Sequence, residues 1–235
     1  MCSGRVDLEF ILRAFSNGHD GVFIGGCRLN ECNYITQGNY DALSNTHLCK
    51  KLLEYIGVNP ERLRIEFMSS GDGILLAEVI NDFGKKVKEL GPLGISEEIG
   101  EDELKSKLEQ VRKLVPYIKI VKRDKLEKRL ENAEEYNDYF TSEEIEELFS
   151  EVDSYYIDPD KCQACMICLR RCPVEAIVGG KNQIHVIDQE KCIKCGTCFE
   201  ACPSRFGAVQ KITGEPVPPP IPEEERTIVR KSKEK

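Results

Sequence analysis

Apolar positions in the first part of the chain follow two different periods. Between residues 8 and 15 they recur at helical spacing behind Asp7, a residue type that caps helices, so a helix is expected there. A short apolar run at residues 21–26 and an alternating run at residues 63–67 each predict a buried strand. The chain therefore begins with a helix followed by strand-forming segments.

Two further helices are predicted around these strands. Residues 47–56 are amphipathic and stop at Gly57, and residues 74–90 form a long helical pattern. The order helix, strand, helix, strand, helix is that of a parallel α/β unit. Because isolated small sheets are marginal, we expect either a partner chain to complete this sheet or residues upstream of Met1 to be missing from this chain.

The middle of the chain indicates charged helices. Residues 96–153 hold 18 acidic and 10 basic residues, whereas the rest of the chain is formally neutral. One helix is expected to break at Pro116, a second to cover residues 124–139, and a third to begin at Thr141. A solvated helical spacer is the simpler interpretation, and an arm that docks a partner is the alternative.

The last third contains an internal repeat of thirty residues. Two runs with the spacing Cys-x2-Cys-x2-Cys-x3-Cys-Pro begin at Cys162 and Cys192. This is the spacing of bacterial two-cluster ferredoxins, in which the fourth cysteine of each run ligates the other cluster. The expected ligand sets are Cys162, Cys165, Cys168 and Cys202 for the first [4Fe-4S] cluster, and Cys192, Cys195, Cys198 and Cys172 for the second.

The same runs exclude a simple zinc interpretation. Structural zinc sites use two cysteine pairs separated by a longer loop, which doubled runs with a following proline do not resemble. We expect the fourth cysteine of each run to begin a helix. The segment resembles the two-[4Fe-4S] ferredoxin module, which carries single electrons and catalyses nothing by itself.

Composition narrows the function classes further. Twelve cysteines without a secretory signal favour metal centres in a reducing, cytoplasmic compartment over disulfides. The net charge of -8 argues against a nucleic-acid binder, and no apolar run approaches the ~18 residues that a membrane helix needs. No glycine-rich flavin or nucleotide motif follows a predicted strand. The proline-rich end, residues 214–235, is expected to be extended or disordered.

Four cysteines lie outside the two runs. Cys27 and Cys32 bracket a loop directly after the first predicted strand, and Cys2 precedes the first helix. Loops at the carboxyl ends of parallel strands are where α/β folds place their sites, so these three thiols could converge. From spacing alone, a metal site and buried structural cysteines are equally favoured.

Four motifs in the same region are distinctive. They are MCSGRVD at residues 1–7, DGVFIGGC at residues 20–27, ECNY at residues 31–34 and GNY at residues 38–40. They make residues 1–93 similar to the delta subunit of methyl-viologen-reducing hydrogenase. That family is a small α/β protein with a [2Fe-2S] cluster. It relays electrons between a hydrogenase or formate dehydrogenase and the flavin subunit of heterodisulfide reductase. The resemblance implies the same role here, with Cys2, Cys27 and Cys32 as cluster ligands.

The chain departs from that family in one respect. Family members have an additional strand–helix segment with a cysteine pair ahead of the Cys-Ser-Gly-Arg stretch, and it is absent here. Three explanations stay open: the missing half is a separate polypeptide or part of a neighbouring subunit, the start codon is misassigned, or the cluster has been lost. Cys49 occupies a position that is usually apolar in the family and is interpreted as structural, which leaves the fourth ligand unassigned.

The sequence therefore predicts a non-catalytic electron-transfer subunit of a cytoplasmic oxidoreductase complex. Its expected partners are subunits of a hydrogenase or formate dehydrogenase, together with a heterodisulfide reductase-like flavin subunit. Alternatives are a ferredoxin-type subunit of another cytoplasmic redox complex, or a redox-sensing scaffold. The expected parts are an α/β domain with a partial parallel sheet at 1–94, a charged helical spacer at 95–153, an α+β two-cluster ferredoxin-like domain at 154–213, and the tail at 214–235.

Overall fold

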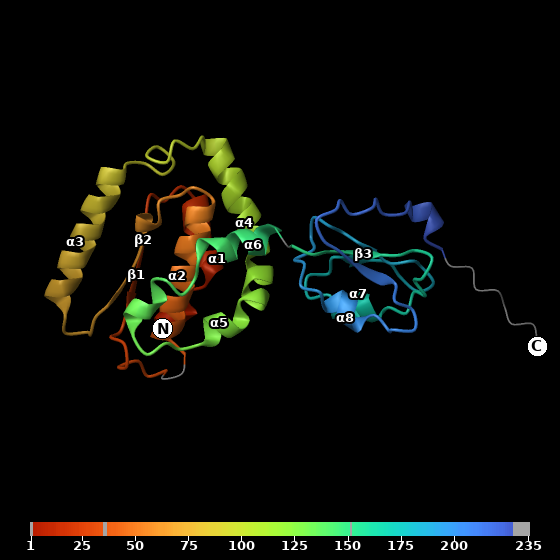
Figure 1. Ribbon diagram of the computed structural model, residues 1–235, viewed down its shortest axis with the longest axis horizontal. Coiled ribbons are helices and arrows are strands. Elements are labelled where there is room, and N and C mark those ends of the chain that lie inside the picture. The colour runs from red at the N-terminus through yellow and green to blue at the C-terminus, as the bar shows by residue number, and fades with distance from the viewer. Residues whose placement is uncertain (1, 35–36, 151, 228–235) are drawn as a thin grey trace, which may run out of the picture. The chain divides into compact units, whose positions relative to one another are not determined.

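The computed structural model describes residues 2–34, 37–150 and 152–227 (Figure 1). The chain divides into two compact units, Met1–Leu148 and Phe149–Lys235. The first is an α/β unit with additional helices, and the second is a small unit of short strands and helices. This confirms the expected fold class. No helix in the described part of the chain is both long enough and apolar enough to cross a bilayer.

The sheet of the first unit consists of two parallel strands among the described residues. β1 (Val22–Gly26) pairs with β2 (Leu63–Phe67) in a register that joins Val22 to Leu63 and Gly26 to Phe67. Both predicted strands are confirmed, and so is the small size of the sheet. α2 (Asn39–Tyr55) connects the strands, and the sheet lies between α2 and α3 (Gly73–Leu90) (Figure 1).

The core of this unit is built mainly by α1 (Leu8–Ser16) and α2. Asp7 caps α1 as predicted, because its carboxylate accepts a hydrogen bond of 3.0 Å from the Glu9 N–H. Apolar residues on facing sides of the two helices are fully or almost fully buried: Leu8, Ile11, Leu12, Phe15, Leu48, Leu52 and Leu53. In contrast, α3 buries only Phe83, whose ring contacts Phe23 of β1.

The helices after residue 95 pack onto the same unit. α4 (Glu101–Val121) lies against α1, and Arg112 pairs with Glu9 at 2.7 Å. The prediction that Pro116 breaks this helix is wrong. A proline withholds one backbone hydrogen bond, but Tyr117 and Ile118 directly after it are buried, and their burial favours continuing the helix.

The predicted helix over residues 124–139 is also wrong. α5 (Arg123–Glu127) ends after five residues, and a 3-10 turn follows at Ala133–Tyr136. Tyr136 is buried with Leu130 against residues of α2, and this packing requires an irregular chain between the two. α6 (Ser142–Ser150) begins where predicted, and the Thr141 hydroxyl accepts a hydrogen bond from the Glu144 N–H.

The second unit has two antiparallel strand pairs. β3 (Ser154–Ile157) pairs with β6 (Val209–Ile212), and β4 (Ile177–Val178) pairs with β5 (Val186–Ile187). The short helices α7 (Ile167–Arg171) and α8 (Thr197–Ala201) pack against each other. The tail passes a 3-10 turn at Glu223–Glu225, and Ile184 N–H donates to Arg226 O at 2.7 Å. Residues 228–235 of the expected tail lie outside the described residues.

The thirty-residue repeat of the sequence is also a structural repeat. Asp158 and Asp188 follow matched strands, and each side chain accepts a hydrogen bond of 3.0 Å from the N–H two residues later. Their carbonyl oxygens accept from the N–H of Cys162 and Cys192, respectively. The two cysteine runs therefore start from the same local turn.

Candidate iron–sulfur centres

The backbone of both cysteine runs is kinked at matched positions. Ala164 and Lys194 have φ angles of 49° and 56°, and Met166 and Gly196 have φ angles of 65° and 75°. Such left-handed residues turn a chain sharply and point successive N–H groups to one side. The matched kinks wrap the first three cysteines of each run around one point.

The third cysteine of each run lies within a helix, and the fourth ends it. Cys168 and Cys198 lie inside α7 and α8, whereas Cys172 and Cys202 are the residues that cap their carboxyl ends. The prediction that the fourth cysteine begins a helix is therefore wrong. Ending a short helix with an extended residue carries the fourth thiol away from its own run.

Electrostatics show which thiols lie near Cys168. Burial raises the pKa of Cys168 to about 11, and the nearby thiols of Cys162, Cys165 and Cys202 raise it further toward that value. These are the four cysteines that the spacing assigns to the first cluster. The structure brings them together, including the one from the other run.

The second set is arranged in the same way. Burial is the first cause that raises the pKa of Cys192, and the thiols of Cys195 and Cys172 add to it. The pKa of Cys198 is raised to about 12 by burial, then by Cys192, Cys195 and Cys168. Since Cys168 acts on Cys198, the two sets adjoin along the α7–α8 contact.

Several groups are placed to donate hydrogen bonds to the sulfurs. Cys172 Sγ accepts from the Ala176 N–H at 3.2 Å, Cys192 Sγ accepts from the Lys194 N–H at 3.4 Å, and Cys195 Sγ lies 3.2 Å from the Thr197 hydroxyl. Such bonds favour the thiolate, which is the form that binds metal.

This donor set fits a pair of cubanes. Each group has four thiols, and iron–sulfur clusters of this type are held by four cysteine thiolates. Across the described ranges, no three His, Cys, Asp or Glu side chains gather around one point as a single metal ion would require. Thiolates on a cubane are spread over four iron atoms, so this spacing fits the cluster better than zinc.

The three amino-terminal cysteines converge as well. Cys2 Sγ lies 3.6 Å from Cys32 Sγ. Burial, then the thiol of Cys32, then that of Cys2 raise the pKa of Cys27, so all three sulfurs are neighbours. The N–H of Tyr34 is the largest cause that lowers the pKa of Cys32.

Cys49 lies apart from this group. It is fully buried in α2, and burial alone raises the pKa of its thiol well above the ordinary value. No other thiol contributes to that shift. Its position is that of a packing residue in the helix core.

Close backbone approach shapes the amino-terminal site. A Cβ on Gly4 would lie 2.4 Å from the Gly38 Cα, and a Cβ on Gly38, whose φ is 95°, would lie 2.7 Å from Cys32 Sγ. Both positions therefore require glycine. Asn39 holds the other side, because its Nδ2 donates to the carbonyls of Cys27 and Arg28 at 2.8 Å each.

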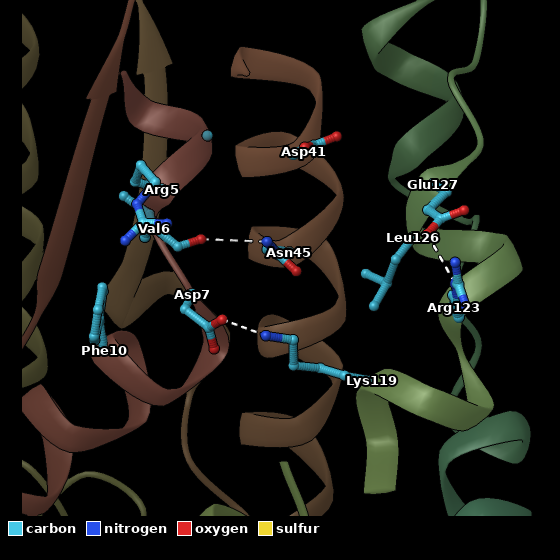
Figure 2. A pocket seen from close by; sticks show the side chains of 11 residues that line it. Arg5, Val6, Asp7, Phe10, Asp41, Asn45, Lys119, Arg123, Leu126 and Glu127 are labelled. Carbon is cyan, nitrogen blue, oxygen red and sulfur yellow. Dashed lines mark hydrogen bonds and ion pairs between the residues drawn. The ribbon is translucent and has the colours of Figure 1, made fainter. Parts of the chain in front are cut away.

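The segment that carries Cys2 is anchored from two helices. Figure 2 shows Asn45 of α2 donating to Val6 O, at 3.2 Å, and Asp7 paired with Lys119 of α4. These contacts line a cavity of about 380 Å³ with charged groups of both signs. Burial raises the pKa of Asp41 in this cavity, and Glu127 adds to the shift. The cavity contains no cysteine and serves to position the segment.

One residue near the candidate centres is missed by the sequence analysis. His185 is almost fully buried, and its Nδ1 lies 3.7 Å from Cys168 Sγ. Burial lowers its pKa. The repeat itself could have pointed to it, since His185 is matched thirty residues earlier by Tyr155, which lies just before the first run.

Comparisons with known proteins match the two parts of the chain separately. Residues 1–91 match the family model described as methyl-viologen-reducing hydrogenase, delta subunit. Residues 154–203 match a 4Fe-4S dicluster domain. The two matches fall on the regions that contain the two groups of candidate ligands.

Individual relatives belong to two kinds of protein. The chain is 48% identical over 91 residues to an iron-sulfur subunit of the F420-non-reducing hydrogenase of Archaeoglobus profundus, covering 39% of this chain and 66% of that one. It is 39% identical over 100 residues to the vhc iron-sulfur subunit of the F420-non-reducing hydrogenase of Methanococcus voltae, covering 43% and 69%.

A third relative is a much longer protein. Over 94 residues the chain is 44% identical to a subunit of the ferredoxin/F420H2-dependent CoB-CoM heterodisulfide reductase of Methanosarcina acetivorans, which covers 40% of this chain and 12% of that one. The chain thus spans about two thirds of the hydrogenase relatives and about an eighth of the heterodisulfide reductase relative.

Proposed function

Since the chain both carries a 4Fe-4S dicluster domain and belongs to the family of the methyl-viologen-reducing hydrogenase delta subunit, we propose that it relays single electrons within a larger complex. Its donor would be a hydrogenase or formate dehydrogenase, and its acceptor a heterodisulfide reductase-like flavin subunit. One observation carries this proposal. The same amino-terminal stretch occurs in hydrogenase iron-sulfur subunits and in heterodisulfide reductase subunits, and here it shares a chain with eight paired-run cysteines.

The chain would hold two [4Fe-4S] clusters in crossed ligand sets. Cys202 joins the first run, and Cys172 joins the second, as their electrostatic neighbours favour. Bound clusters supply one-electron redox chemistry. The chain's own residues bury the thiolates and donate N–H groups to them, which stabilises the negative charge of each centre.

A [2Fe-2S] cluster at the amino-terminal thiols is the third proposed centre. Cys2, Cys27 and Cys32 supply three of the four cysteines that such a cluster uses, and the distance between Cys2 and Cys32 suits two ligands of one iron. Because Cys49 lies apart, we propose that the fourth ligand comes from a polypeptide segment outside these residues, on the same or a neighbouring chain.

The proposed functional division keeps the α/β part at residues 1–94 and the ferredoxin part at residues 154–213. Residues 95–153 join them, and α4 gives this stretch a second role, because it packs on α1 and Lys119 fixes the Cys2 segment. Residues 214–235 form the tail.

An exposed apolar strip on α3 is proposed as the surface for the heterodisulfide reductase-like partner. Ile74 is 80% exposed, and Leu75, Leu76 and Ile80 are also exposed. Contiguous apolar surface of this kind marks interaction sites. We choose this partner because the same stretch is covalently continuous with the rest of the heterodisulfide reductase subunit in the long relatives, so the two have to lie side by side there.

The test is a count of iron and sulfide in the anaerobically purified chain, with electron paramagnetic resonance of the reduced form. Two cubanes give about 8 Fe, and an added [2Fe-2S] cluster gives about 10. We expect about 8 for the chain alone and about 10 in the complex that contains the missing ligand. Bound zinc with almost no iron would overturn the proposal.

A further inference from the structure

We infer that His185 donates its Nδ1–H to Cys168 Sγ, and that it thereby gives the first [4Fe-4S] centre a higher reduction potential than the second. This inference rests on the proposed iron–sulfur function. It concerns one contact inside the second unit, between a side chain just before β5 and a ligand on α7.

The position of the imidazole ring is fixed by its surroundings. His185 is 1% exposed, and its Nδ1 lies 3.7 Å from Cys168 Sγ, within hydrogen-bonding range for sulfur. Gly179, with a φ of 154°, lies against the ring, and a Cβ there would come within 2.3 Å of His185 Cδ2. The absence of that Cβ lets the ring lie where Nδ1 faces the sulfur.

The direction of the hydrogen bond follows from the partners of the two ring nitrogens. A ligating thiolate has lone pairs and no proton, so it can only accept. Nε2 is buried and has no partner among the described residues. A proton on Nε2 alone would leave that N–H unpaired and turn the Nδ1 lone pair toward the thiolate. A proton on Nδ1 satisfies the sulfur and avoids both costs.

The matched position in the other half carries a different group. Tyr155 precedes the first run by the same interval as His185 precedes the second, and its ring packs on Phe199 at 6.1 Å between centroids. Its hydroxyl lies against Gly196, where a Cβ would come within 2.9 Å. An imidazole N–H against Cys168 in one half is therefore replaced by a phenol against a loop glycine in the other.

A hydrogen bond to a ligand sulfur raises the reduction potential of a cluster. It stabilises the reduced centre more than the oxidised one, because the reduced centre holds one more negative charge. An electron shared by the two centres would then reside on the first. In this step one electron leaves the second centre and enters the first, no bond forms or breaks, and the proton stays on Nδ1.

The test measures both midpoint potentials in the full-length, cluster-loaded chain by a redox titration followed by electron paramagnetic resonance. His185→Phe keeps an aromatic ring and removes the donor, and Tyr155→Phe at the matched position is the control. We expect two separate potentials in the unsubstituted chain. His185→Phe should shift the higher one downward and narrow the gap, whereas Tyr155→Phe should leave the higher one in place.

The inference is overturned when His185→Phe retains both clusters and leaves both potentials unchanged. A chain that binds no iron would overturn the proposed function as well, so the two failures are distinct. A second measurement covers a variant that fails to assemble. In the reduced His19→Gln, His47→Gln double variant labelled with ¹⁵N in its remaining histidine ring, pulsed resonance should detect a nitrogen coupling, and its absence would contradict the contact.

Discussion

Arg62 and Glu97 form a buried ion pair that joins two parts of the sequence expected to be separate. The distance from Arg62 Nε to Glu97 Oε1 is 2.7 Å, and the two side chains are 0% and 4% exposed. The same guanidinium donates to the carbonyls of Leu90, Gly91 and Pro92 beyond the end of α3. The boundary expected near residue 94 is therefore crossed by a network that holds the α3 terminus to the start of β2.

Removing one partner of this pair is expected to destabilise the first unit strongly. Glu97→Gln leaves a buried guanidinium without its counter-charge, which typically costs about 3–5 kcal/mol of unfolding free energy. Urea unfolding followed by circular dichroism measures it. The matched control is Glu127→Gln, because the Arg123–Glu127 pair is largely exposed and its loss should have little effect. Equal effects of the two substitutions would contradict this account.

The same carboxylate makes stability depend on pH. Burial raises the pKa of Glu97, but hydrogen bonds from Arg62, Asn59 and Ser96 outweigh it, so the pKa lies below its ordinary value. Its stabilisation is therefore present above the unfolded-state pKa and is lost as the pH falls through the lower folded-state value. The difference in unfolding midpoint between the unsubstituted chain and Glu97→Gln should shrink in acid. A difference that grows in acid would contradict the sign.

Crossed ligation predicts which substitutions remove the same cluster. Cys202→Ala and Cys162→Ala should each abolish one resonance component, and Cys172→Ala and Cys192→Ala should each abolish the other. The reason is that each set needs all four thiolates. Spectra of the four variants, recorded after anaerobic reconstitution, provide the measurement. Loss of the same component by Cys172→Ala and Cys162→Ala would indicate uncrossed sets instead.

The amino-terminal centre should depend on the three converging thiols and not on Cys49. In the complex, Cys2→Ser, Cys27→Ser and Cys32→Ser should each abolish the [2Fe-2S] signal. Cys49→Ala serves as the control, because it removes a fully buried sulfur from α2 and should lower stability while leaving the signal. Loss of the signal in Cys49→Ala, with the chain folded, would identify it as the fourth ligand after all.

Charge on the apolar strip of α3 should weaken association with the heterodisulfide reductase-like partner. Ile74→Asp adds a charge to a side chain that is already 80% exposed, so the fold should tolerate it while the interface should not. Affinity of the purified proteins, measured by interferometry, should fall at least tenfold. Lys85→Glu, a charge change at an exposed position elsewhere on α3, controls for net charge. Unchanged affinity in Ile74→Asp would place the interface elsewhere.

The sequence by itself determined the features that depend on near neighbours. The strands at residues 22–26 and 63–67 follow from short apolar patterns, because burial of alternate or successive side chains is a local property. The two cysteine runs follow from spacing, because three ligands of one cluster must lie within a few residues of each other. Even the convergence of Cys2, Cys27 and Cys32 was expected from the rule that sites gather where parallel strands end.

Only the tertiary structure decided the features that depend on distant residues. α4 continues through Pro116 because Ile118 is buried against the first unit, and residues 128–136 leave the helix because Tyr136 packs on α2. Lys119 meets Asp7 across more than a hundred residues, and His185 meets Cys168 through the fold of the repeat. No local pattern encodes such partners, because their free energy arises only when separate segments pack together.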